Sequence, residues 1–158
     1  MKYTVSELRK HCHTDNRIAY MFDGNEYLSD DYPDVVKTSA VVVNGTFMVD
    51  EHADRFTFDL EIACELTMLC ALSLKEVIVP LSFRTTLAFA DVAADDSILL
   101  IDGVTIDLDP YIWAEILVEK PMKVESKDAR KHYREEIVTL DESEKLADNP
   151  FAKLIKKD

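Results

Sequence analysis

The most regular feature of the chain is an alternation of apolar and polar residues that runs from Phe56 to Phe89. Over 56–72 every even-numbered residue is apolar, whereas most odd-numbered residues are polar or acidic. A period of two is typical of a strand with one buried face and one wet face. After a break at 71–75, apolar residues occupy all the odd-numbered positions from Val77 to Phe89 except Thr85. The pattern predicts two long strands that form a central hairpin.

The residues before this hairpin predict shorter elements. Residues 4–12 fit an amphipathic helix with Ser6 as its candidate N-cap, and 17–22 fit a short strand. Residues 23–34 are rich in Gly, Asn, Ser, Asp and Pro, which indicates a loop. The loop carries five carboxylates, but their spacing does not match an EF-hand. A solvated loop is therefore favoured over a calcium site.

Two sequence features bear on how the strands are joined and placed in the sheet. Asn44-Gly45 lies between apolar residues within 35–49, and such a pair favours a tight hairpin turn. A bulge within one long strand is the alternative, and the hairpin is slightly favoured. Pro80 lies in the returning strand of the central hairpin and lacks a donor for the sheet, so we expect that strand to be an edge strand or a bulged one.

The region after the central hairpin predicts two short strands and a helix. The strands span 98–101 and 104–108 and are separated by an Asp-Gly turn. Asp109 is the predicted N-cap of a helix at 110–120, with Pro110 at the first helical position. This helix carries an apolar stripe that we expect to cover one face of the sheet: Ile112, Trp113, Ile116 and Leu117.

The last quarter of the chain is charged and has few apolar residues. We expect the segment at about 123–148 to be its most mobile part, followed by a short C-terminal helix that starts at Asn149-Pro150. The predicted fold is α+β, a mostly antiparallel sheet built around a long central hairpin, with an N-terminal helix, a helix at 110–120 and the C-terminal helix. Residues 1–158 are predicted to form a single domain.

Charge and composition narrow the range of functions. The net charge is -13, and residues 1–120 hold nine basic against 22 acidic residues. Such a surface repels nucleic-acid phosphate and attracts basic partners, although solubility alone explains it equally well. Three cysteines fit a reducing compartment, the N-terminus is too charged for a signal peptide, and no apolar run is long enough to span a membrane. We expect a cytoplasmic protein without a membrane partner.

No motif for catalysis or cofactor binding is present. The chain lacks GxSxG, P-loop, HExxH, GxGxxG and CxxC patterns. His11, Cys12 and His13 are adjacent, which is the wrong spacing for ligands of one metal. Cys64 and Cys70 are interpreted as small core hydrophobes. These observations predict a binding domain that is not an enzyme, with no cofactor, no metal and no evident small-molecule substrate.

One basic segment is a candidate contact site. Its cationic residues follow helical spacing at i, i+3, i+4 and i+7, and two possible stacking groups lie beside them, so the set is Lys127, Arg130, Lys131, His132, Tyr133 and Arg134. A cationic stripe of this kind could bind a phosphate backbone. The favoured alternative is a solvated helix face that nearby carboxylates neutralise: Glu125, Asp128, Glu135 and Glu136.

The order of these features resembles a known family. An N-terminal SELRKH helix is followed by VVVNGTFMVDEHADRFTFDLEIACELTMLCALSLKEVIVPLSF, an acidic loop, IDGVTIDLDPYIWAEILVEKPMK and a terminal NPFAKLIK. This order is similar to that of the YceD family, also called DUF177 or large ribosomal RNA subunit accumulation proteins. The resemblance implies a bacterial factor for accumulation of large-subunit (23S) ribosomal RNA, whose partner is that RNA or a basic ribosomal protein or assembly factor. An acidic interaction adaptor unrelated to ribosomes is the alternative.

The chain departs from the family pattern at its cysteines. Where members typically have Cys-x-x-Cys-Leu at the hairpin turn, this chain has Cys70 and then Ser73 in place of the second cysteine. Many members carry further cysteines after the main helix, and the residues that follow Pro121 here contain none. The resemblance therefore implies that this chain lacks the thiolates for any metal that such members hold.

Overall fold

The computed structural model describes residues 1–92 and 96–144, with side chains up to residue 138. The fold is α+β with a mostly antiparallel sheet, as the sequence predicts. Its elements, in chain order, are β1 (Lys2–Thr4), α1 (Val5–His11), β2 (Arg17–Asp23), the 3-10 helix η1 (Gly24–Tyr27), β3 (Val35–Thr38), β4 (Ala40–Asp50), β5 (Arg55–Leu69), β6 (Glu76–Ala90), β7 (Ile98–Leu100), β8 (Thr105–Asp107), α2 (Asp109–Glu119) and α3 (Lys127–Glu144).

The chain forms two compact units. The first contains residues 1–68 and 78–122, and the second contains residues 69–77 and the chain from residue 123 onward. We call residues 69–77 the hairpin tip, because they connect β5 to β6. The first unit holds most of the sheet with α1 and α2, and the second unit holds α3.

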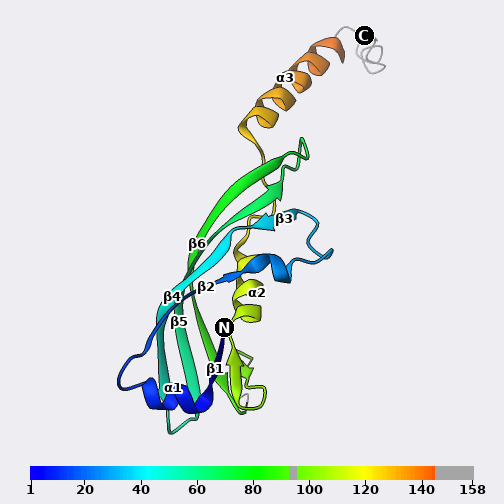
Figure 1. The fold of residues 1–158 in the computed structure, drawn as a ribbon. Coiled ribbons are helices and arrows are strands. Elements are labelled where there is room, and N and C mark those ends of the chain that lie inside the picture. The colour runs from blue at the N-terminus through cyan, green and yellow to red at the C-terminus, as the bar shows by residue number, and fades with distance from the viewer. Residues whose placement is uncertain (93–95, 145–158) are drawn as a thin grey trace, which may run out of the picture. The chain divides into compact units, whose positions relative to one another are not determined.

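The main sheet has the strand order β2-β4-β5-β6-β7, and β3 pairs with the end of β5 (Figure 1). β4 lies antiparallel to both β2 and β5, whereas β7 runs parallel to β6. Two three-residue strands, β1 and β8, form a separate antiparallel ribbon. β5 and β6 are the long strands that the alternation predicts, so the central hairpin is confirmed.

The core is built on the even-numbered face of β5. Side chains from Phe56 to Met68 at these positions are at most 6% exposed, whereas Asp59, Glu61 and Glu65 on the other face are exposed. Burial of apolar surface is worth about 25 cal/mol per Å², so this row is a main source of stability. The predicted stripe of α2 is buried at three positions, Ile112, Trp113 and Ile116, and half-buried at Leu117.

Asn44-Gly45 does not form a hairpin turn, so that prediction is wrong. Both residues lie inside β4, where Asn44 pairs with Ala19 of β2 and Gly45 pairs with Leu60 of β5. The strand break lies at Ser39, between β3 and β4. Neighbouring strands on both sides satisfy the backbone of β4, and this outweighs the local turn preference of an Asn-Gly pair.

The N-terminal helix is confirmed, but its cap differs from the prediction. Thr4 caps α1 instead of Ser6: its hydroxyl accepts a hydrogen bond from the Glu7 N–H at 3.3 Å. The Glu7 carboxylate in turn accepts one from the Thr4 N–H at 3.2 Å. This reciprocal capping box satisfies two backbone donors, which a cap at Ser6 would leave without these partners.

Asp109 does not cap α2, contrary to the prediction. Leu108 is the N-cap residue, and no side chain caps the helix. The Asp109 carboxylate instead accepts hydrogen bonds from the Tyr20 hydroxyl, at 2.8 Å, and from the Met1 ammonium group. Burial and this hydrogen bond to Asp109 raise the pKa of Tyr20. The Asp109 carboxylate therefore bonds to residues distant in sequence and does not cap the N-terminus of α2.

The strands around Asp102 and Gly103 belong to different sheets. A single bridge joins Asp102 to Thr105, and Gly103 has φ 69° in the turn between them. β7 then pairs with β6, whereas β8 pairs with β1. The predicted turn is present, but it redirects the chain from one sheet to another.

Pro80 is on an edge of the sheet, as predicted, because β7 pairs only with Ala88–Ala90 of β6. The charged segment at 123–148 contains α3, and the C-terminal helix predicted from Asn149 lies outside the described residues. No helix in the described part of the chain is long and apolar enough to cross a membrane.

Candidate functional site

The second unit joins the start of α3 to the hairpin tip. Ser126 caps α3, because its hydroxyl accepts a hydrogen bond from the Ala129 N–H at 3.1 Å. The Ser126 N–H donates to the Cys70 Sγ at 3.3 Å, and the Ala71 N–H donates to the Val124 carbonyl at 2.9 Å. These contacts connect residues that are about 55 positions apart in the sequence and hold the first turn of α3.

Cys70 is the residue on which this connection depends. Its side chain is fully buried, as predicted for a core hydrophobe. The nearby Ser73 hydroxyl and the backbone N–H groups of Ser126, Ser73 and Leu72 lower the pKa of the thiol to about 6. A thiolate beside the N-terminus of α3 is stabilised by the helix dipole as well. The sequence prediction missed this acceptor role, because nothing near Cys70 in the sequence points to Ser126.

The four cationic residues of the candidate stripe lie on one side of α3. Lys127, Arg130, Lys131 and Arg134 are all exposed, and α3 is helical throughout their span. With about 100° of rotation per residue, positions i, i+3, i+4 and i+7 share a side. The helix that the stripe required is therefore present. Arg130 contacts Glu125, with its Nε 3.7 Å from the carboxylate, and at such exposure this pair contributes little.

The two predicted stacking residues have different positions on α3. Tyr133 is 51% exposed and is an i+3 neighbour of Arg130, so it borders the cationic stripe. His132 lies one turn from both Asp128 and Glu136, and its Nε2 is 3.9 Å from the Glu136 carboxylate. His132 therefore belongs to the acidic side of the helix. Of these two residues, Tyr133 is the one that lies beside the cationic stripe.

Apolar residues that the site prediction omitted also lie on α3. Ile137 is 47% exposed and Val138 is 57% exposed. Ile137 is an i+4 neighbour of Tyr133, so the two extend one exposed apolar row beside the cations. The signal was available in the sequence as the spacing of Ala129, Tyr133 and Ile137.

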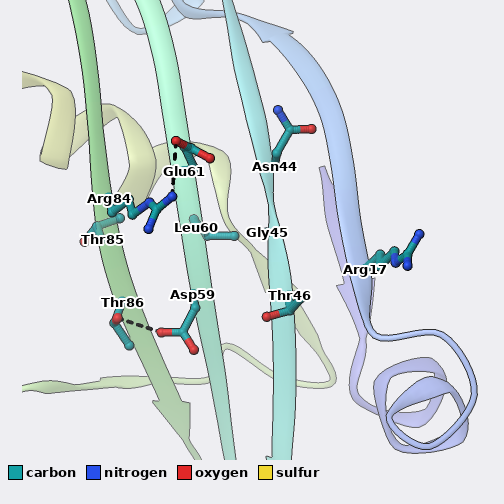
Figure 2. Close-up of a pocket in the computed structure, with 10 residues that line it drawn as sticks. All are labelled: Arg17, Asn44, Gly45, Thr46, Asp59, Leu60, Glu61, Arg84, Thr85 and Thr86. Carbon is teal, nitrogen blue, oxygen red and sulfur yellow. Dashed lines mark hydrogen bonds and ion pairs between the residues drawn. The ribbon is translucent and has the colours of Figure 1, made fainter.

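The sheet carries a hollow of about 460 Å³ on its exposed face (Figure 2). Two pairs of lining side chains meet across the central hairpin: Arg84 lies 3.6 Å from the Glu61 carboxylate, and the Thr86 hydroxyl donates to Asp59 at 2.7 Å. Arg17 points away from these pairs in Figure 2. The lining contains no His or Cys, and its acids already have partners, so the hollow offers no evident nucleophile or general base.

The residues considered as metal ligands are not brought together. The Cys12 thiol donates to the Arg9 carbonyl at 3.1 Å, and the His13 ring lies 3.9 Å from the Glu51 carboxylate. In the loop at 23–34, Asp23 accepts from the Asn25 N–H, and Asp34 contacts the Lys120 ammonium at 2.5 Å. Within residues 1–92 and 96–138, no group of three or more His, Cys, Asp or Glu side chains is placed to hold a metal ion.

Comparison with known proteins finds a distant relative. The chain is 28% identical over 131 residues to a Bacillus subtilis (strain 168) protein described as uncharacterized protein YlbN, and the match covers 78% of this chain and 73% of the relative. No family model matches the chain. No solved structure matches it.

Proposed function

We propose that the protein is a non-catalytic ribosome-assembly factor of the bacterial cytoplasm that supports accumulation of large-subunit ribosomal RNA, and that α3 contacts RNA. The observation that carries the proposal is the row of exposed cations on one side of α3: Lys127, Arg130, Lys131 and Arg134. The resemblance of the chain to the YceD family supports the ribosomal role. Tyr133 supports the choice of RNA, because unpaired RNA bases stack on aromatic side chains.

The charge distribution fits a contact confined to α3. Residues 1–120 hold nine basic and 22 acidic residues, whereas residues 121–158 hold nine of each. The excess acid of residues 1–120 disfavours non-specific binding to phosphate, so RNA would be held only where cations cluster. Alternatively, the acidic surface itself holds a basic ribosomal protein or assembly factor, or the chain is an adaptor without a ribosomal role.

Charge reversal on α3 tests the RNA contact. We expect a variant with Lys127→Glu, Arg130→Glu, Lys131→Glu and Arg134→Glu to lose crosslinking to ribosomal RNA in cells while its circular dichroism spectrum is unchanged, because these side chains are exposed. In vitro, each lost phosphate contact lowers the slope of log K against log salt by about 0.7 for single-stranded RNA.

A matched control reverses four exposed cations outside α3: Lys10, Arg17, Lys37 and Lys75. This variant changes the net charge by the same amount, so we expect it to retain most of the crosslinking if α3 is the contact. Crosslinking that survives reversal on α3, or that both variants lose equally, would contradict a specific role for the stripe.

The ribosomal role is tested separately by depletion. We expect depletion of the protein to lower the amount of large-subunit RNA and of the large subunit in sedimentation profiles. Unchanged profiles would contradict the assembly role. Affinity purification that recovers only non-ribosomal partners would favour the adaptor, and recovery of a basic ribosomal protein without RNA would favour the protein contact.

A further inference from the structure

One edge of the main sheet is left unpaired along β6. β5 lies on one side of β6, and β7 pairs with the other side only at Ala88–Ala90 (Figure 1). Over 78–86, no other described strand pairs with that second side. Unpaired edges invite strand addition, and proteins usually protect them or use them for binding.

The backbone groups that face this edge can be identified. The Ala90 carbonyl accepts a hydrogen bond from the Ile101 N–H at 3.1 Å, on the side of β6 away from β5. Backbone groups of alternate residues point to the same side of an antiparallel strand, so even-numbered residues face the free edge. Ser82, Arg84 and Thr86 therefore present their N–H and C=O groups to a partner. Pro80 occupies the next such position and ends the row, because it has no N–H.

The side chains along this edge are incompletely covered. Leu81 and Phe83 are half-buried, although the residues of β5 that share their face of the sheet are at most 6% exposed. An added strand would place its alternate side chains beside Leu81 and Phe83 and remove more of their apolar surface from water. The edge thus offers both hydrogen-bonding groups and an apolar row.

Acidic residues on the exposed face of the sheet, beside this edge strand, indicate the chemistry of the partner. An added strand with its apolar residues beside Leu81 and Phe83 directs its other side chains to the opposite face of the sheet, which carries Arg84 and Thr86. On this face Asp59, Glu61 and Glu65 of β5 are exposed, and Arg84 pairs with Glu61. Residues 1–120 also carry all the excess negative charge of the chain. A basic segment therefore fits the edge better than a neutral or acidic one.

We propose that the edge of β6 from Ser82 to Thr86 binds an extended basic segment of a partner protein by β-strand addition. The segment alternates apolar residues, which pack beside Leu81 and Phe83, with basic residues. A second copy of the chain fits less well, because its net charge of -13 repels a copy of itself and its own edge is interrupted by Pro80. The inference does not rest on the RNA contact of α3.

A synthetic peptide of alternating Lys and Val, KVKVKVK, serves as the probe. We expect the full chain to bind it in fluorescence anisotropy at low salt, and amide hydrogen exchange of Ser82, Arg84 and Thr86 to slow on binding. The matched peptide EVEVEVE should bind at least about tenfold more weakly. A second control is a KVKVKVK peptide with N-methyl groups on two adjacent central residues. Adjacent residues point their N–H groups to opposite edges of a strand, so one methyl group removes a main-chain donor whichever edge of the peptide faces β6. This peptide should also bind about tenfold more weakly.

A proline variant tests the edge within the protein. Ser82→Pro removes an N–H that points away from β5, so it leaves the hydrogen bonds between β5 and β6 in place, and the chain already accommodates a proline at the equivalent position Pro80. We expect this variant to bind the peptide about tenfold more weakly. Ser82→Ala keeps that N–H and should bind as the unchanged chain does. Equal binding of the N-methylated peptide, which needs no change in the protein, would overturn the proposal. Three other results would also overturn it. They are peptide-induced protection from exchange at amides other than Ser82, Arg84 and Thr86, equal binding of EVEVEVE, and dimers of the chain that slow exchange at these three amides without peptide.

Discussion

Gly45 lies where β4 approaches the backbone of β5 too closely for a side chain. A Cβ atom at this position would be 2.1 Å from the Asp59 carbonyl oxygen and 3.0 Å from the Leu60 Cα. Both obstacles are backbone atoms of the neighbouring strand, so no flexible side chain can move aside. The glycine is thus required by strand packing, since its backbone remains in an ordinary extended strand.

We predict that Gly45→Ala lowers the free energy of unfolding by about 3 kcal/mol, because the two strands must move apart. The comparison is Gly103→Ala. Gly103 has φ 69°, but a Cβ at this position would have no atom within 4 Å, so only backbone strain of about 1 kcal/mol applies. Urea denaturation measures both variants. Equal losses would show that the close approach at Gly45 is relaxed in solution.

At the scale of elements, α3 shows how far local spacing can be interpreted. The i, i+3, i+4, i+7 spacing places the cations on one side only if the segment is helical, and the structure shows this helix. The spacing could not reveal that Ser126 caps this helix and donates to Cys70, a residue 56 positions away. A hydrogen bond of that sequence separation leaves no periodic signal, so the contact between α3 and the hairpin tip was not predicted.

The Cys70 contact predicts a pH dependence of stability. The folded chain releases the Cys70 proton near pH 6, whereas an unfolded thiol keeps it to about pH 9. Between these values the unfolded state binds more protons, so the free energy of unfolding rises with pH, and this contribution is lost as the pH falls through 6. We expect Cys70→Ser to reduce this rise in urea denaturation series from pH 6 to 9.

Cys64 is the matched control for this series. Burial raises the pKa of its thiol, against a smaller opposing effect of the Thr38 hydroxyl, so both folded and unfolded chains keep that proton below about pH 9. Cys64→Ser should therefore leave the slope between pH 6 and 9 unchanged. An identical slope in the Cys70→Ser variant, or no thiolate absorbance assignable to Cys70 at neutral pH, would contradict the lowered pKa.

At the scale of the whole molecule, charge separates two proposed contacts. The excess acid lies in residues 1–120, and the cationic row lies in the neutral remainder. The RNA contact uses residues of the second compact unit, and the β6 edge from Ser82 to Thr86 belongs to the first. No residue serves both.

We therefore predict that the two contacts can be removed independently. The variant reversed at Lys127, Arg130, Lys131 and Arg134 should bind KVKVKVK at least as tightly as the unchanged chain, because it is more acidic. Ser82→Pro should leave RNA crosslinking unchanged. If charge reversal on α3 weakened peptide binding, the peptide would bind at α3 and not at the β6 edge, which would contradict the proposal.

The sequence by itself determined the features that depend on local geometry. Alternation with a period of two predicted β5 and β6, helical spacing predicted the apolar stripe of α2 and the cationic row of α3, and the residue count established the acidic charge. Each of these follows from where successive side chains point along one element, so a single segment contains all the information needed.

Only the tertiary structure decided which segments meet. It placed Asn44-Gly45 inside a paired strand, sent β7 and β8 to different sheets, and assigned the Asp109 carboxylate to Tyr20 and Met1. In each case a partner distant in sequence outweighed a local preference, because turn and cap preferences amount to about 1 kcal/mol whereas buried backbone groups must all be paired. The edge of β6 was predicted from Pro80 as one of two possibilities, an edge or a bulge, and only the pairing of β7 shows that no described strand lies beside residues 78–86 on that side.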